Sequence, residues 1–116
     1  MDLFHNWFNL KPGVRDTEFC DALTLYLSAL KDRGDIVDYR VMRRKLAFGP
    51  SELGEFHVVI ETDGLAQLDR AFGTVSARSG AIESLHAAVN QHVCDLRAAL
   101  YRDFPDSHRQ RSEEQF

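Results

Sequence analysis

The sequence predicts an α+β fold of the ferredoxin-like βαββαβ type, in which one four-stranded antiparallel sheet carries helices on one face only. Three observations support this prediction. Strand-like and helix-like segments follow one another in the order strand, helix, strand, strand, helix, strand. The strand-like segments alternate apolar and polar residues, and the helix-like segments repeat apolar residues every three or four positions. Right-handed crossovers then place the first and third strands in the centre of the sheet and the second and fourth at its edges.

The first strand and the first helix are separated by a clear break. Residues 3–10 are rich in aromatic side chains and are predicted to form the strand, which ends before Pro12 and Gly13. The helix follows, with Asp16 as its N-cap and Gly34 at its C-terminal end. The residues expected to face the core repeat at helical spacing: Phe19, Leu23, Leu27 and Leu30.

The three remaining strands are predicted over residues 36–46, 55–62 and 93–103. Glycine and proline mark the connection between the first two of these as a loop longer than a tight hairpin turn. In the last segment, apolar and polar positions alternate from residue 96 to residue 101, which favours a strand. The alanines and Leu-Arg pairs of that segment would also suit a helix.

The second helical region is predicted to be interrupted. Thr62 or Asp63 is expected to cap its first part, and Ser79 is expected to start its second part. The apolar stripes of the two parts are Leu65, Leu68, Phe72 and Val75, then Ile82, Leu85 and Val89. Whether residues 64–78 and 79–92 form one kinked helix stays open at this point.

The composition is that of one globular domain, with 116 residues, 44% hydrophobic residues and a formal net charge of −4. We expect a single ferredoxin-like domain over residues 1–106 and a polar flexible tail over residues 107–116. The acidic balance disfavours nucleic acid as a partner, because phosphate binding requires a basic surface. The sequence has no signal-peptide pattern, no apolar run of about 20 residues and no C-x-x-C pair. We therefore expect a cytoplasmic protein without a membrane partner.

Strand alternation assigns residues to the two faces of the sheet. The face toward the helices takes the apolar set: Phe4, Phe8, Val37, Val41, Phe56, Val58, Ile60, Leu96, Ala98 and Leu100. The opposite face takes the other set: His5, Trp7, Asn9, Arg40, Met42, Arg44, Glu55, His57, Val59, Glu61, Arg97, Ala99 and Tyr101. That second face therefore combines imidazole, cationic and aromatic side chains.

Two explanations fit this second face. In the first, water covers it, and two exposed ion pairs form: Arg40–Glu61 and Arg44–Glu55. In the second, another copy of the chain covers it, because a bare sheet rarely displays a large apolar patch. The residues that form this patch are Trp7, Met42, Val59 and Tyr101. Two sheets stacked face to face would close a barrel with the helices outside, and both copies would line its centre.

Four segments carry a resemblance to a known superfamily: WFNLKPGVRDTEF, YRVMRRKLAFGPSELGEFHVVIET, LAQLDRAF and LRAALYRDFPD. They cover most of residues 5–106, and the chain resembles the dimeric α+β-barrel superfamily, within it a small bacterial family of uncharacterised function. The resemblance implies a ferredoxin-like protomer, a homodimer, and a pocket between sheet and helices or inside the barrel. It does not imply one activity, because members include cofactor-independent monooxygenases, isomerases and haem enzymes.

We predict that the protein binds or transforms a small organic molecule, an anion among the candidates, in a pocket on the sheet face. The predicted ligand-binding residues are Trp7, Asn9, Arg40, Arg44, His57 and Tyr101. The catalytic candidates are His57, His5 and Tyr101, since imidazole exchanges protons near neutral pH and arginine holds anions by paired hydrogen bonds. The alternatives are a cofactor-independent monooxygenase or isomerase, and a structural or regulatory homodimer without a ligand.

Neither a metal nor another cofactor is expected. His5 and His57 together with Glu55 or Glu61 would supply three ligands, but the sequence has no H-x-H or H-x-x-x-H spacing around them. Histidines that simply line a polar surface are more common than metal ligands.

Overall fold

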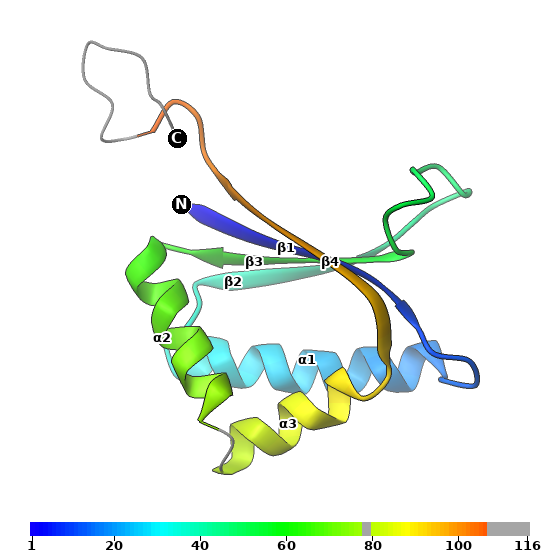
Figure 1. The fold of residues 1–116 in the computed structure, drawn as a ribbon. Helices are drawn as coiled ribbons and strands as arrows, with labels where there is room; N and C mark the ends of the chain where they lie inside the picture. The colour runs from blue at the N-terminus through cyan, green and yellow to red at the C-terminus, as the bar shows by residue number, and fades with distance from the viewer. Residues whose placement is uncertain (78–79, 107–116) are drawn as a thin grey trace.

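The structure is a computed structural model that describes residues 1–77 and 80–106. Its elements are β1 (Asp2–Leu10), α1 (Asp16–Asp32), β2 (Asp38–Arg43), β3 (Phe56–Thr62), α2 (Leu65–Ser76), α3 (Gly80–Asn90) and β4 (Val93–Arg102). The four strands form one antiparallel sheet in the order β2-β3-β1-β4. The three helices lie on one side of this sheet (Figure 1). The predicted ferredoxin-like α+β fold, with the first and third strands central, is therefore confirmed.

The register of the sheet confirms the predicted strand phase. Trp7 is the cross-strand partner of His57, and His5 is the partner of Val59. Residues of the opposite phase form the core beneath the sheet, where Phe8, Phe56 and Val58 are buried. The edge strand β4 differs from its central neighbours, because its helix-side residues Leu96 and Leu100 stay 56% and 51% exposed.

Helix α1 has the predicted core face and the predicted end. Its four apolar residues, Phe19, Leu23, Leu27 and Leu30, are all buried. Gly34 adopts a φ of +80°, and Asp35 N–H donates to the Leu30 carbonyl at 3.0 Å, which is a Schellman C-cap. The predicted N-cap was wrong by one residue: Arg15 is the cap, and Asp16 is the first helical residue.

Strand β2 is shorter than the predicted range of 36–46. The chain leaves the strand after Arg43, and Leu46 and Ala47 adopt positive φ angles of 53° and 59°. The Arg44 side chain turns into the loop, where its Nη2 donates to the carbonyls of Pro50 at 2.9 Å and Leu53 at 2.7 Å. Arg44 N–H still donates to the Glu55 carbonyl at 2.7 Å, and hydrogen bonding within the loop replaces the sheet ladder beyond this residue.

The start and the buried face of α2 also differ from the prediction. Gly64 is the N-cap, while the Thr62 hydroxyl is buried and donates to the Asp2 carbonyl at 3.1 Å. Leu65 and Phe72 are about half exposed, and Gln67 is buried instead. The burial of Gln67 has a reason: its amide accepts from Asp63 N–H at 2.8 Å and donates to the Gly34 carbonyl at 3.1 Å.

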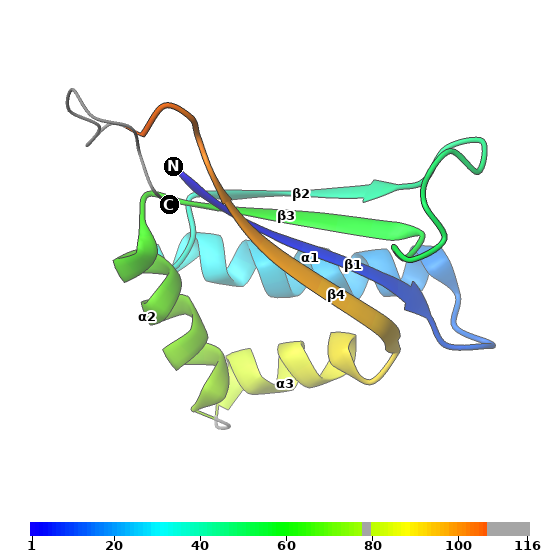
Figure 2. The same ribbon diagram turned by 45° about the horizontal axis from the view of Figure 1, so that its top comes forward.

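Helices α2 and α3 are separate elements that run in clearly different directions (Figure 2). The predicted start at Ser79 and the predicted tail over residues 107–116 lie outside the described residues. Within residues 1–77 and 80–106, no helix has the length and apolarity needed to cross a membrane.

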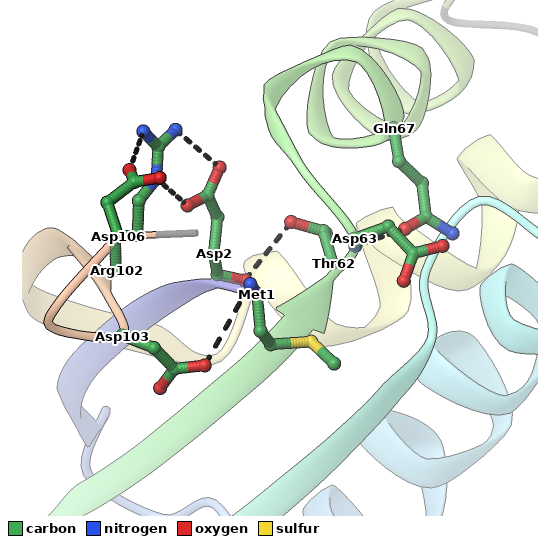
Figure 3. Close-up of polar contacts among 8 residues, drawn as sticks. All are labelled: Met1, Asp2, Thr62, Asp63, Gln67, Arg102, Asp103 and Asp106. Carbon is green, nitrogen blue, oxygen red and sulfur yellow. Dashed lines mark hydrogen bonds and ion pairs between the residues drawn. The ribbon is translucent and has the colours of Figure 1, made fainter. Parts of the chain in front are cut away.

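A charged cluster joins the first strand to the last (Figure 3). The Arg102 guanidinium donates to both carboxylate oxygens of Asp2, with 3.1 Å between Nη2 and Oδ2, and to Asp106 at 2.7 Å. Asp2 is only 2% exposed, and its hydrogen bond from Arg102 lowers the pKa of its carboxyl below the usual value. We refer to these three residues as the terminal clasp.

Candidate functional site

Four of the predicted site residues meet on the outer face, by which we mean the face of the sheet that the helices leave uncovered. The rings of Trp7 and His57 stack with centroids 4.5 Å apart and an interplanar angle of 13°. His5 Nδ1 lies 2.9 Å from His57 Nε2, and the ring of Tyr101 meets His5 edge-on at 5.0 Å. His5, Trp7, His57 and Tyr101 therefore share one surface, as the alternation of residues along the strands predicted.

The two imidazoles of this cluster favour the neutral form. Burial lowers the pKa of His5, and burial together with the charge of His5 lowers the pKa of His57. A hydrogen bond between two imidazoles also requires that one ring nitrogen accepts, which a protonated ring cannot do. At most one of the two rings can therefore be in the protonated, positively charged form while the contact persists.

The other predicted site residues are not part of this cluster. Asn9 is held at the end of β1, where its Oδ1 accepts from Glu55 N–H at 2.9 Å and its Nδ2 donates to Asp95 at 3.1 Å. Arg44 is engaged by the loop carbonyls described above. Arg40 is exposed on β2 opposite Val59.

The ion pairs expected on a water-covered face are not the ones that form. Glu55 Oε1 accepts from Arg43 Nε at 2.8 Å, and the other side of the Arg43 guanidinium contacts Asp16 at 2.9 Å. Arg43 therefore takes the partner that the sequence assigned to Arg44, because Arg44 has left the strand.

A cavity of about 230 Å³ lies on the opposite side of the sheet, between the strands and the three helices. Its walls are mostly apolar side chains of the core, among them Phe8, Leu27 and Val58. Four polar residues complete the lining: Asn6, Tyr26, His86 and Asn90. Residues far apart in the chain thus meet around one mainly apolar space.

None of these four polar residues is among the site residues that the sequence predicted. Asn6 gave one signal, since it is a polar residue in the helix-facing phase of β1 between Phe4 and Phe8. Tyr26, His86 and Asn90 gave none, because their place at the cavity depends on how α1 and α3 pack together.

Two of the polar residues form a contact at the wall between α1 and α3. The ring centroids of Tyr26 and His86 lie 5.4 Å apart, and His86 Nδ1 is 4.0 Å from Glu83 Oε2. Burial, with the added negative charge of Glu83, raises the pKa of Tyr26 to about 12. The Tyr26 phenol therefore stays protonated at neutral pH and is available as a hydrogen-bond donor.

The arrangement suits a small organic ligand better than a metal. Pockets for small molecules are mainly apolar and carry a few well-placed polar groups, as this cavity does. In the part of the chain that the structure describes, no three or more His, Cys, Asp or Glu side chains are grouped so as to hold a metal ion.

Comparison with known proteins identifies a family and a fold. The family model for a family of unknown function, DUF6614, matches residues 1–116. A comparison with curated proteins finds no match. Among solved structures, the chain is similar to SnoaB from Streptomyces nogalater, described as a cofactor-independent oxygenase, with 10% identity and a TM-score of 0.68 over 93% of this chain and 97% of that chain.

Two further similar structures are described as dimeric ferredoxin-like proteins of unknown function. The one from Thermobifida fusca has 19% identity and a TM-score of 0.58, covering 87% of this chain and 90% of that chain. The one from Bacteroides fragilis has 14% identity and a TM-score of 0.59, covering 88% and 95%. At these identities the likeness shows the shared fold.

Proposed function

We propose that this chain, which belongs to DUF6614, a family of unknown function, forms a homodimer. Each copy would bind a small, mainly apolar organic molecule in the cavity between sheet and helices. The observation that carries this proposal is the cavity itself. Its volume of about 230 Å³ is just below the range of about 300–1,000 Å³ that is typical of drug-sized ligands. The expected ligand is therefore about the size of one substituted ring.

The cavity has a route to solvent between α2 and α3. A second hollow, which we call the outer groove, is lined by residues of both helices, among them Asp69 and Glu83. The cavity and the outer groove share four residues: Phe72, Val75, His86 and Asn90. Phe72 is 48% exposed although its ring contacts Phe4, so that it lies where a ligand would pass from the groove to the interior.

The outer face supports the dimer part of the proposal. Trp7 and His57 present stacked rings on a surface that no helix covers, and Tyr101 is 60% exposed beside them. A second copy would bury this cluster against its own equivalent, as isologous interfaces do. The dimeric ferredoxin-like proteins of similar fold are consistent with such an assembly. The prediction that Trp7, Asn9, Arg40, Arg44, His57 and Tyr101 line a ligand pocket stays a prediction, and it requires this second copy.

A second candidate function is oxygenation without a cofactor. One specific observation favours it: the chain shares its fold, over 93% of its length, with SnoaB, which is described as a cofactor-independent oxygenase. Oxygen consumption on addition of a ligand found in the cavity would separate this candidate from simple binding.

A pair of matched variants tests the binding proposal. Ala71 is buried in α2 and lines the cavity, whereas Ala66 is exposed on the same helix. Ala71→Phe fills the cavity and is expected to weaken binding of 4-nitroanisole by at least about tenfold in equilibrium dialysis, and Ala66→Phe is expected to leave it unchanged. Val75→Trp blocks the boundary with the outer groove and serves as a second variant if Ala71→Phe does not fold.

Saturable binding by the wild type that both cavity variants lose would support the proposal. Absence of saturable binding, or equal binding by wild type and the cavity variants, would overturn it. Native mass spectrometry of the purified wild type would add the mass of any molecule that is retained from the host.

A further inference from the structure

We propose that His86 is the group of the cavity that accepts a proton from a weakly acidic hydroxyl of the ligand, a phenol or an enol, and that Glu83 is its positioning residue. This inference rests on the proposed function, because it needs a ligand in the cavity. It names the chemistry of that ligand and the residue that acts on it.

The position of His86 is the first argument. It lines both the cavity and the outer groove, so that it stands at the boundary between the apolar interior and solvent. Its Nδ1 is the nitrogen near Glu83, at 4.0 Å from Oε2. Among the described residues no hydrogen bond engages His86 Nε2, and this nitrogen is therefore left for a ligand. Imidazole is the side chain whose ordinary titration suits proton exchange near neutral pH.

The groups that face His86 are the second argument. Glu83 comes from its own helix, Asp69 from α2 across the outer groove, and Tyr26 from α1. The phenol of Tyr26, with its pKa raised to about 12, keeps its proton and can donate a hydrogen bond to the oxygen that becomes negative.

The charge of the lining is the third argument, and it selects the class of ligand. Within the described residues, neither the cavity nor the outer groove is lined by Lys or Arg. A permanently anionic carboxylate or phosphate would enter past Asp69 and Glu83, which repel it, and no Lys or Arg among the described lining residues would receive it. A weakly acidic ligand can enter in its neutral form. It becomes an anion only when its hydroxyl proton passes to His86, and the resulting imidazolium then lies beside the new negative charge. The structure thus favours a phenol or enol over the anion that the sequence placed among the candidates.

The step itself is one proton transfer and needs no co-reactant. The O–H bond of the ligand breaks, its electron pair stays on oxygen, and a new N–H bond forms at His86 Nε2. The products are a bound phenolate or enolate and an imidazolium, so that the net charge of the complex does not change.

Two probes of nearly equal shape separate this step from binding. We would use 4-nitrophenol, whose phenolate form is seen by its visible absorbance, and 4-nitroanisole, which has no acidic proton. Bound to the wild type, 4-nitrophenol is expected to ionise at a lower pH than in solution. His86→Gln is expected to abolish this shift and to weaken the binding of 4-nitrophenol roughly tenfold more than it weakens the binding of 4-nitroanisole.

The controls identify the roles of the neighbours. His92→Gln makes the same substitution beyond the end of α3, outside the cavity lining, and is expected to leave the shift intact. Glu83→Gln is expected to reduce the shift while a smaller shift remains, because the His86 imidazole is still present to accept the proton.

Each outcome decides between the proposals. If both probes bind and 4-nitrophenol ionises as it does in solution, or ionises equally in His86→Gln, the inference about His86 is overturned while the binding proposal stands. If neither probe binds the wild type, both are overturned.

Discussion

Replacing Arg102 with methionine is expected to destabilise the fold by about 2–3 kcal/mol, because it removes the cation of the terminal clasp. Arg102 donates to both carboxylate oxygens of Asp2, which is 2% exposed, and to Asp106 at 2.7 Å. Without the guanidinium, a buried carboxylate at the start of β1 loses the donors that stabilise its charge. Methionine keeps much of the apolar stem, so that the change tests the charge rather than the packing.

The magnitude follows from the exposure of the two partners. Breaking a fully buried ion pair costs about 3–5 kcal/mol, and losing hydrogen bonds to a charged group costs about 1.5–3 kcal/mol. The Arg102 side chain is 39% exposed, which means that water can reach the site and replace part of the lost interaction. The expected loss of about 2–3 kcal/mol therefore lies below the range for a fully buried pair and in the upper part of the range for lost hydrogen bonds, and for a chain of this length it lowers Tm by about 8–12 °C.

The assay is urea unfolding of wild type and variant at several pH values. The pKa of Asp2 is lowered in the folded state, so its contribution is present above the ordinary Asp value near 4 and is lost as the pH falls through the folded value. The difference between wild type and Arg102→Met should therefore be full at pH 7 and shrink below about pH 4. Arg70→Met, at an exposed position on α2, is the control. A difference below about 0.5 kcal/mol at pH 7, or one that is as large at pH 3, would refute this reasoning.

Two other substitutions probe the outer face and the loop before β3. Trp7→Glu should weaken the proposed dimer by more than about a hundredfold in sedimentation velocity, because two unpaired charges would be buried in the interface. The control Trp7→Phe should keep the dimer. An unchanged dimer in Trp7→Glu, or a wild type that is monomeric at every concentration, would contradict the proposed interface. Gly54→Ala should cost about 1–3 kcal/mol in thermal unfolding, since a Cβ there overlaps the backbone carbonyl of Phe8. Gly73→Ala, which meets nothing within 4 Å, should be neutral or stabilising, and equal effects of the two changes would argue against the packing at Gly54.

The phase of the strands could be predicted because it depends on local alternation. Trp7 and His57 were placed on one face from the sequence, and the register of β1 and β3 pairs them directly. Strand order could also be predicted, since the sequence of elements and the handedness of crossovers leave one arrangement. The core face of α1 followed from helical spacing alone.

The bounds of β2 could not be predicted, because they depend on contacts within the following loop. Leu46 and Ala47 adopt positive φ angles that nothing in their residue types indicates, and the Arg44 side chain is held by carbonyls up to ten residues away. These contacts hold the Arg44 side chain in the loop, and the Glu55 carboxylate pairs with Arg43 instead of with the predicted Arg44.

The cavity lay beyond sequence reasoning for a related cause. Its lining depends on how α2 and α3 stand against the sheet, and no strand or helix pattern carries that information. Tyr26 and His86 come together only because α1 and α3 pack side by side. The buried Gln67 likewise replaced an expected apolar residue because two backbone groups at separate turns need its amide.

The most direct test of the cavity as a ligand site is an NMR spectrum of the protein, with labelled methyl groups, in the presence of 4-nitroanisole. Intermolecular nuclear Overhauser effects from the aromatic protons of the probe should reach methyl groups of Leu27, Val58 and Ala71, which line the cavity from α1, β3 and α2. Contacts confined to exposed methyl groups such as those of Leu25 and Leu46, with none to these three, would contradict the proposal that a small organic molecule occupies the space beneath the sheet.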